Sequence, residues 1–308
     1  MRKTSLDAVY ELAKRDSRVV FIGSDLGIGT LKQFKAEMPD RFFMEGVSEA
    51  HIVTMAAGLA MEGRVVYINT IATFLTRRCF EQVCLDLSLH QTNVRLIGSG
   101  GGVVYAPLGP THEAIEDVAI FRTLPRMTIV APSDAEEMKR LMPQTLDWAG
   151  PMYIRLGKGG DAVVSRPDLG FQIGRAIPVR DGSDALIVTT GVTLQPALAA
   201  AAQLEQSGIS AAVLHMHTVK PFDAEALLAH ANRVPVVLSV EEHTIIGGLG
   251  SAVAESLAEA KFSTPKHFKR MGIPDVFPDK YGSQASLMAR YGLTEEGIVT
   301  ELRKLLAR

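Results

Sequence analysis

The chain has 308 residues, of which 47% are hydrophobic and 21% are charged, a content that suits two packed domains better than one. Its 32 basic residues nearly balance 34 acidic ones, so the net charge of −2 gives no electrostatic footprint for nucleic acid or an anionic membrane. No apolar run approaches the ~20 residues of a membrane-spanning helix, and the polar N-terminus has no signal-peptide stretch. We therefore expect a soluble protein without nucleic-acid or membrane partners.

The two cysteines, Cys79 and Cys84, lie in one segment that is predicted to be helical. Five residues of helix separate their side chains by about 140° around the axis, which argues against a disulfide between them. The chain has no C-x-x-C spacing of the kind that binds metals. Few cysteines and no disulfide suit a reducing compartment, so we predict a cytoplasmic location.

The first half of the chain alternates short β-branched runs with longer helical patterns. The predicted strands are 19–23, 65–68, 94–97, 127–130 and 152–155, and the predicted helices are 47–61, 74–89, 114–121 and one that starts near Pro132. Ser133 is the predicted N-cap of that last helix, with Glu136 as its capping-box partner. Strands that alternate with helices predict a mostly parallel sheet covered on both faces.

The pattern dissolves between Gly157 and Arg166, where we place a domain boundary. A second α/β series follows, with predicted strands at 185–188, 211–214 and 236–239 and predicted helices at 194–206, 224–231, 250–260 and 294–307. Thr294 is the predicted N-cap of the closing helix. The sequence therefore predicts an α/β protein of two domains, residues 1–165 and 166–308, each with a mostly parallel sheet flanked by helices.

Two glycine-containing segments could form binding loops, and the first of them follows a predicted strand, at the edge where α/β sheets place their ligands. Gly98-Ser-Gly-Gly-Gly102 would let a ligand approach the backbone closely, or would form a flexible loop. Gly109-Pro-Thr-His-Glu113 presents His112 just before a predicted helix. His112 could act on a substrate oxygen or shuttle a proton, or it could be a structural cap.

Several other side chains allow both a chemical and a structural interpretation. Glu49 precedes a small-residue helix face, where it could act as a buried carboxylate or favour the helix dipole. Phe74 begins a predicted helix and is of a residue type that usually joins the core. The basic residues that could bind an anion, or lie on a solvated surface, are Arg2, Arg77, Arg155 and Lys158. The segment 241–250 is either a site or a tight turn at a subunit contact, and we favour the turn.

The order and spacing of these motifs resemble one family over essentially the whole chain. The matching segments are Arg2-Lys-Thr-Ser5, Gly23-Ser-Asp-Leu26, Val47-Ser-Glu-Ala-His51, Thr73-Phe-Leu75, Gly109-Pro-Thr-His112, Pro132-Ser-Asp134, Val219-Lys-Pro-Phe-Asp223 and Glu241-Glu-His243. The chain resembles the pyrimidine-binding and C-terminal domains of transketolase and of 1-deoxy-xylulose-5-phosphate synthase.

The resemblance implies a role for each matching residue. Glu49 would hydrogen-bond the aminopyrimidine ring of thiamine diphosphate and favour the imino tautomer, whose nitrogen deprotonates the thiazolium carbon. Phe74 would stack on the pyrimidine, with Thr73 and Arg77 as further cofactor contacts. His112 would lie near the reacting substrate oxygens. The remaining residues that match substrate ligands are Arg2, Ser24, Arg155 and Lys158.

The family's Gly-Asp-Gly motif with its following Asn, which holds the metal and the diphosphate, does not occur in this sequence. The resemblance therefore implies the small subunit of a split transketolase that acts on sugar phosphates. A larger N-terminal (alpha) subunit would carry the Mg²⁺ and diphosphate site, and two copies of each chain would form an α2β2 assembly.

Three positions depart from the transketolase pattern. Leu108 replaces an acidic residue that usually contacts the donor sugar, and Gly100 replaces a phosphate-side His. Arg77, three residues after Phe74, is closer to the pattern of the deoxyxylulose-phosphate synthases. The expected reaction is transfer of a two-carbon ketol unit, with the donor sugar left open. The alternatives are decarboxylative condensation of pyruvate, the small subunit of a 2-oxo-acid dehydrogenase, and a non-catalytic partner subunit.

Overall fold

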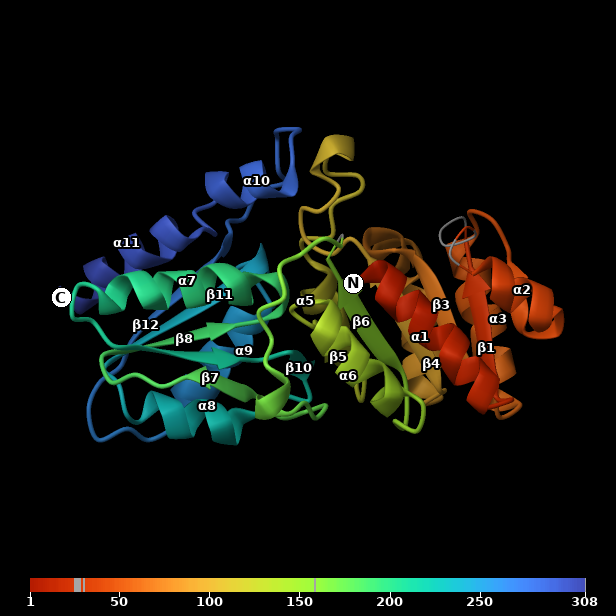
Figure 1. Ribbon diagram of the computed structural model, residues 1–308, viewed down its shortest axis with the longest axis horizontal. Helices are drawn as coiled ribbons and strands as arrows, with labels where there is room; N and C mark the ends of the chain where they lie inside the picture. Colours follow the sequence, from red (N-terminus) through yellow and green to blue (C-terminus); the bar gives the residue numbers. More distant parts are fainter. Residues whose placement is uncertain (25–28, 30, 158, 308) are drawn as a thin grey trace.

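The computed structural model describes residues 1–24, 29, 31–157 and 159–307, which form two sheets that lie side by side, each flanked by helices (Figure 1). The first sheet has seven strands in the order β10-β5-β6-β4-β3-β1-β2. The second has five strands in the order β12-β11-β8-β9-β7. The predicted fold class, an α/β protein with two mostly parallel sheets, is therefore confirmed.

Six strands of the first sheet come from the first half of the chain and run parallel. They are β1 (Val19–Gly23), β2 (Phe42–Met44), β3 (Val65–Ile71), β4 (Val94–Ser99), β5 (Thr128–Val130) and β6 (Met152–Leu156). The seventh strand, β10 (Thr218–Lys220), comes from the second half of the chain and pairs antiparallel with β5. The second half of the chain thus completes one edge of the first sheet.

The second sheet has parallel strands except at one edge, where β7 runs antiparallel to β9. Its strands are β7 (Ile177–Arg180), β8 (Ala185–Thr189), β9 (Ala211–His215), β11 (Val236–Thr244) and β12 (His267–Ile273). Strands β8, β9 and β11 extend the three predicted strands at their carboxyl ends. That extension includes residues 241–244, which matter for the site described below.

Alternate residues of the buried strands face opposite layers of helices, as the two-residue period of a strand requires. Val19 and Phe21 of β1 pack with one layer, whereas Val20 and Ile22 pack with the other. The first layer holds α1 (Arg2–Arg15), α2 (Lys32–Glu37) and α6 (Ala135–Thr145), and the second holds α3 (Glu49–Met61), α5 (Asp117–Arg122) and segment 74–89. This second layer carries Glu49, Phe74 and Arg77 of the predicted site.

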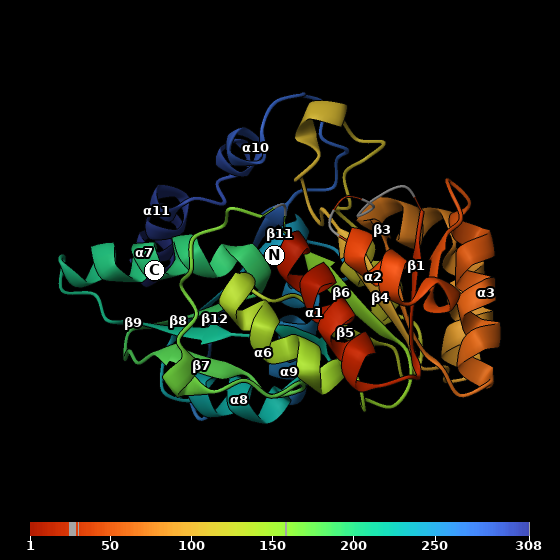
Figure 2. The same cartoon turned by 45° about the vertical axis from the view of Figure 1, so that its right-hand side comes forward.

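The second sheet is covered in the same way on both faces. Helices α7 (Leu194–Glu205), α10 (Gln284–Arg290) and α11 (Glu295–Leu306) pack on one face, and α8 (Ala224–Ala231) and α9 (Leu249–Glu259) pack on the other. Thr294 accepts a hydrogen bond from the Gly297 amide, so the predicted N-cap of α11 is confirmed. The chain that leads into α10 rises beside the loop that carries His112 in both views (Figures 1 and 2).

The segment predicted as one helix from 74 to 89 is helical but irregular. It consists of two π-helical segments, η2 (Phe74–Arg78) and η3 (Val83–Leu89), on either side of the short α4 (Phe80–Gln82). π-Helical turns are rare and occur frequently at functional sites. The helices predicted from residues 47 and 114 begin later, at Glu49 and Asp117.

The predicted N-cap at Ser133 is wrong by one residue, because α6 begins at Ala135. Asp134 is the cap, and its carboxylate accepts hydrogen bonds from the Glu136 and Glu137 amides at 3.0 and 2.9 Å. The reciprocal bond comes from Glu137 rather than from the predicted Glu136, since its Oε2 accepts from the Ser133 amide at 2.6 Å. The shift of one position leaves the capping chemistry itself unchanged.

The described part of the chain contains no helix that is long and apolar enough to cross a membrane. Cys79 and Cys84 are both free thiols, as predicted. The domain boundary at 165/166 stays a prediction; it falls in the irregular segment between β6 and β7.

Candidate active site

Glu49 is the first residue of α3, and its side chain is 1% exposed. Its carboxylate Oε2 accepts a hydrogen bond from Nη1 of Arg78 at 2.5 Å. The Arg78 side chain, by contrast, is 47% exposed. A buried carboxylate therefore has one charged partner that reaches it from the solvent side.

Phe74 and His112 lie beside this pair. The Arg78 guanidinium lies 4.6 Å from the centroid of the Phe74 ring, a cation–π distance. The His112 ring meets the same Phe74 ring edge-on, with centroids 5.3 Å apart and planes at 63°. The structure thus brings together Glu49, Phe74 and His112, which are far apart in the sequence, and adds Arg78 as the residue that links them.

His112 lies in the loop between η4 (Ala106–Leu108) and α5. Gly109 has φ +76°, a left-handed conformation that favours glycine, and an added Cβ would lie 2.7 Å from Tyr281 in the second domain. The His112 amide donates to the Gly109 carbonyl at 3.0 Å, and its Nδ1 lies 2.9 Å from Thr111 Oγ1. This turn orients His112 toward Phe74.

Arg77 braces the His112 loop. Its guanidinium donates to the carbonyl oxygens of Pro110 and Glu113 at 3.0 Å each, and it forms an ion pair with Glu116. These contacts give Arg77 a structural role in this chain. Its predicted contact with a cofactor stays a prediction, and the geometry favours loop positioning.

Polar side chains line the carboxyl ends of β1, β3 and β4. Ser24 Oγ donates to Thr70 Oγ1 at 2.7 Å, and Ser99 Oγ donates to Asn69 Oδ1 at 3.0 Å. Asn69 Nδ2 is buried with no hydrogen-bond partner among the described residues, and so is the Oγ1 of Thr73. Buried polar atoms without partners are unusual, and they indicate a site that a polar ligand or water completes.

Arg2 begins α1, and its Nη1 donates to the hydroxyl of Tyr105 at 3.4 Å. Tyr105 in turn packs against Gly100, where φ is +76° and any Cβ would collide with the tyrosine ring. Arg2 therefore reaches the loop that leads to His112. Lys158, which is also predicted to bind substrate, lies outside the described residues.

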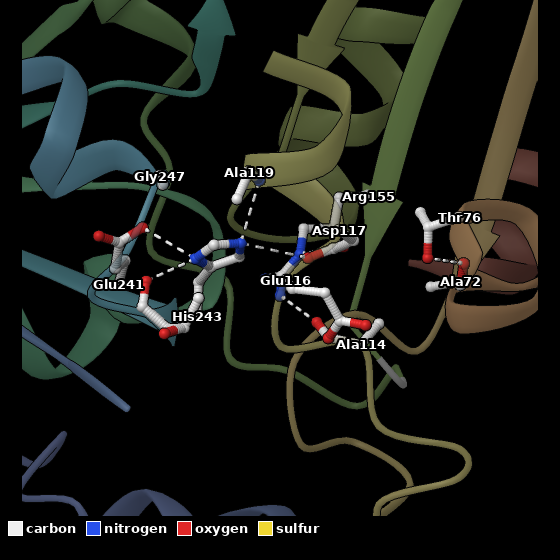
Figure 3. A network of polar contacts seen from close by, with 12 residues as sticks. Ala72, Thr76, Ala114, Glu116, Asp117, Ala119, Arg155, Glu241, His243 and Gly247 are labelled. Carbon is white, nitrogen blue, oxygen red and sulfur yellow. Dashed lines mark hydrogen bonds and ion pairs between the residues drawn. The ribbon is translucent and has the colours of Figure 1, made fainter. Parts of the chain in front are cut away.

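Arg155 is largely buried, with a side chain that is 7% exposed, and its predicted contact with substrate stays a prediction. Its Nε donates to Asp117 at 2.7 Å, and its Nη2 donates to the carbonyls of Ala114 and Glu242 at 3.1 and 2.8 Å (Figure 3). Burial acts to raise the pKa of Asp117, but the charge of the neighbouring Arg155 and the hydrogen bonds from Arg155 and Tyr153 hold that pKa below its usual value. The geometry gives Arg155 a structural role between the two domains.

The segment Glu241-Glu242-His243 lies at the same buried boundary, at the end of β11. His243 Nδ1 donates to the Thr244 carbonyl at 2.6 Å, and Nε2 accepts from the Ala119 amide at 3.2 Å (Figure 3). These two bonds define a neutral tautomer with its proton on Nδ1. The segment expected to form a turn at a subunit contact thus makes a contact between the two halves of this chain.

Glu113, the residue after His112, shows a feature that the sequence analysis misses. It is fully buried, and neither carboxyl oxygen has a hydrogen-bond partner in the described part of the chain. Burial raises its pKa to about 7, although the charge of Arg77 acts in the opposite direction. The sequence hints at the importance of Glu113 only through its position directly after His112. That position does not reveal that its carboxyl group is buried without a partner.

The described residues contain no group of three or more His, Cys, Asp or Glu side chains that could hold a metal ion. The polar groups at this site are instead a carboxylate, an imidazole, a guanidinium and two orphaned side-chain atoms around an aromatic ring. Such a set suits an organic ring with hydrogen-bonding nitrogens.

The model of the transketolase pyrimidine-binding domain matches residues 1–160, and that of the transketolase C-terminal domain matches residues 174–298. This chain belongs to the transketolase family. The resemblance inferred from the motifs is thus confirmed, and the candidate site lies within the pyrimidine-binding part of this transketolase-family chain.

Three proteins of similar length are close relatives. The chain is 37% identical to the 6-deoxy-6-sulfo-D-fructose transketolase subunit SqwH of Clostridium sp. (strain MSTE9), over 100% of this chain and 95% of that protein. It is 38% identical to a subunit of the apulose-4-phosphate transketolase of Phocaeicola vulgatus, over 96% and 94%. A solved structure described as a split gene transketolase, inactive beta4 tetramer, shares 35% identity with a TM-score of 0.90, over 99% and 98%.

Some relatives are longer chains, of which this chain matches about half. The chain is 38% identical to the 1-deoxy-D-xylulose-5-phosphate synthase of Syntrophotalea carbinolica over 96% of this chain, which is 46% of that protein. Sequences similar to this chain therefore occur both as separate subunits and within longer single chains.

Proposed function

We propose that this chain is the small subunit of a thiamine-diphosphate-dependent transketolase that transfers a two-carbon ketol unit between sugar phosphates. One observation carries the proposal: a buried carboxylate, Glu49, lies beside the aromatic ring of Phe74, with His112 against the same ring. Relatives named as transketolase subunits that match the chain over nearly its full length support it.

The described residues fit the aminopyrimidine half of thiamine diphosphate. Glu49 offers a carboxylate oxygen to a ring nitrogen, and Phe74 offers an aromatic surface for stacking. The orphaned Oγ1 of Thr73 adjoins Phe74 and supplies a further donor or acceptor. Together these groups would hold the ring in one orientation.

When bound, thiamine diphosphate supplies the nucleophilic carbon and the electron sink that ketol transfer needs. Glu49 would hold a proton between its carboxylate and the pyrimidine ring nitrogen, and so fix the tautomer of that ring. Thr111 engages Nδ1 of His112, which leaves Nε2 as the atom that would donate to a substrate oxygen. Arg2, Ser24 and Lys158 are the proposed phosphate-side ligands.

We further propose a larger alpha subunit that carries the Mg²⁺ and diphosphate ligands, in an α2β2 assembly located in the cytoplasm. Two lines of support are the subunit names of the similar-length relatives and the inactive state of the related beta4 tetramer. Relatives named for a sulfofructose and for apulose phosphate are compatible with an unusual sugar donor for this chain as well.

The test is turnover by the chain reconstituted with the proposed alpha subunit. With thiamine diphosphate and Mg²⁺, a panel of ketose phosphates should yield a shortened aldose product and an acceptor lengthened by two carbons. The matched control replaces Glu49 by Gln in the same complex. A wild-type complex that binds the cofactor but transfers no ketol unit from any donor would contradict the proposed activity.

A second candidate is decarboxylative condensation of pyruvate with an aldose phosphate. It is favoured by the match to 1-deoxy-D-xylulose-5-phosphate synthases and by Arg77 three residues after Phe74. Incubation of the same complex with labelled pyruvate separates the two reactions. Release of labelled CO₂ would identify the synthase reaction, whereas ketol transfer releases none.

A further inference from the structure

The loop that carries His112 is closed at its base by a short backbone bridge. The Gly102 amide donates to the Ala114 carbonyl at 2.9 Å, and the Ala114 amide donates back to Gly102 at 2.9 Å. The chain leaves the first sheet at Gly102, forms the loop that contains His112, and returns at Ala114, so the bridge joins the two ends of the loop. The position of the bridge therefore sets the position of the loop.

The first limb of the loop rests on a carboxylate from the second domain. Glu242 on β11 is 2% exposed, and its Oε1 accepts hydrogen bonds from the Val103 amide at 3.0 Å and from Gln284 Nε2 at 2.9 Å. Gly102 has φ +66°, and a Cβ there would collide with the Glu242 side chain. Glu242 is therefore in direct contact with both residues that open the loop.

The second limb is held by the same stretch of β11. The Thr244 amide donates to the Ile115 carbonyl at 2.7 Å. The Arg155 guanidinium joins the carbonyls of Glu242 and Ala114, at 2.8 and 3.1 Å. Figure 3 shows how Arg155 and Asp117 of the first domain meet His243 and Glu241 of the second at this boundary. Both limbs of the loop are thus attached to residues 242–244.

We propose that Glu242 is a positioning residue, through which the second domain holds the His112 loop in the geometry that places His112 beside Phe74. Its effect on turnover rests on the proposed transketolase function, whereas its effect on the loop does not. Because Glu242 bonds the loop backbone, its loss would displace a side chain at the site without removing any group from that site. A displacement of about 1 Å can slow an enzyme by on the order of 10²-fold.

The neighbouring Glu241 offers a matched control. It is also a buried carboxylate on β11, but its oxygens accept from the Leu249 and Gly250 amides at 2.7 and 2.8 Å, at the start of α9. It has no hydrogen bond to the His112 loop within the described part of the chain. Loss of a buried acceptor at Glu241 therefore costs stability without a direct effect on the loop.

The first experiment measures amide hydrogen exchange in the full chain alone, without cofactor or partner. In Glu242→Ala we expect the amides of residues 103–112 to exchange at least about 10-fold faster, because the Val103 amide loses its acceptor and the loop base is released. Glu242→Gln keeps a carbonyl oxygen for the Val103 amide and should stay close to wild type, and Glu241→Gln should leave the loop unchanged. Unchanged loop exchange in Glu242→Ala would overturn the proposal.

The second experiment measures kcat, KM and cofactor affinity in the complex with the larger chain. Glu242→Ala should lower kcat by about 10-fold to 100-fold, with cofactor affinity within about twofold of wild type, and Glu242→Gln should restore most of the rate. If Glu242→Ala does not fold, Glu242→Asp serves, since it keeps the carboxyl group but retracts its oxygens from Val103. A wild-type kcat in Glu242→Ala, or in Glu242→Asp where Glu242→Ala does not fold, would overturn the proposal. A wild-type complex without turnover would contradict the transketolase function, and the exchange result would still decide the role of Glu242.

Discussion

Two carboxylate–arginine pairs in this chain look alike in the sequence and differ in their surroundings. Asp117 and Arg155 are both buried, and each makes further hydrogen bonds, so the pair is enclosed between the two domains. Glu49 is equally buried, but its partner Arg78 is half-exposed and also faces the Phe74 ring. The first pair is enclosed by protein, whereas the second is open on one side.

This difference separates a structural ion pair from a binding group. Removal of one member of an enclosed pair leaves an uncompensated charge that the protein cannot solvate, so such a pair contributes to folding. A buried carboxylate that is approached from solvent can exchange its partner for a ligand, at little cost to the fold. We therefore expect changes at the first pair to affect stability and changes at the second to affect chemistry.

The largest expected effect is on turnover in Glu49→Gln. The amide is nearly isosteric with the carboxylate, but it cannot hold the proton that fixes the pyrimidine tautomer, so we expect kcat to fall on the order of 10⁴-fold. Thermal unfolding should show that the fold is intact. Glu45→Gln, at a nearby and more exposed carboxylate, is the matched control and should keep the wild-type rate. A near wild-type rate in Glu49→Gln would remove the proposed role of Glu49.

Next in size is the loss of stability in Asp117→Asn. The change leaves the buried Arg155 guanidinium without its counter-charge, and we expect the free energy of unfolding to fall by about 3–5 kcal/mol. Arg78→Met, the matched change at the open pair, should cost less than about 2 kcal/mol. Denaturant unfolding of both variants measures the difference. Equal losses in the free energy of unfolding would mean that both ion pairs contribute to stability to the same extent, which would contradict the distinction between them.

A smaller effect is expected in His112→Ala. The imidazole lies against Phe74 and would act on substrate oxygens, so its loss should lower kcat on the order of 10²-fold while cofactor affinity changes little. His90→Ala, at an exposed histidine, is the control. Calorimetry and steady-state kinetics on the same samples compare the two quantities. An equal loss of cofactor affinity would assign His112 a structural role instead.

The smallest effect concerns Glu113, through pH. Burial raises its pKa from an ordinary 4.5 to about 7, so the folded state favours the protonated carboxyl. This stabilisation is complete below about pH 4.5 and is lost as the pH rises through 7. Glu113→Gln has no such loss, and it should be more stable than wild type by about 1–3 kcal/mol at pH 8.5, with little difference at pH 4.5. A pH-independent difference in melting temperature would contradict the raised pKa.

The sequence predicts the framework well, because buried parallel strands are continuous β-branched runs and longer helical patterns separate them. It fails where short segments depend on tertiary partners. Strand β10 has three residues and adds to a sheet formed by the other half of the chain, which no local pattern indicates. The π-helical turns of segment 74–89 are missed for a related reason, since a helical period of 3.6 is assumed throughout.

The candidate site shows the same division. The order of the motifs predicts Glu49, Phe74 and His112, and the structure brings them together. The sequence does not predict Arg78 as a site residue, because its contact with Glu49 joins residues that are 29 positions apart. The predicted substrate contact of Arg155 stays a prediction, and the sequence does not show that Asp117 and the second domain enclose this side chain. Burial is a property of the tertiary structure, and a basic residue in isolation carries no sign of it.

The central claim is that this chain holds half of a thiamine diphosphate site and needs a larger partner for the other half. Calorimetry with thiamine diphosphate and Mg²⁺ tests it most directly, first on this chain alone and then on its complex with the proposed alpha subunit. We predict no measurable binding by the chain alone and tight binding by the complex. Tight binding by this chain alone would contradict the account, because the diphosphate and metal ligands would then have to lie within it.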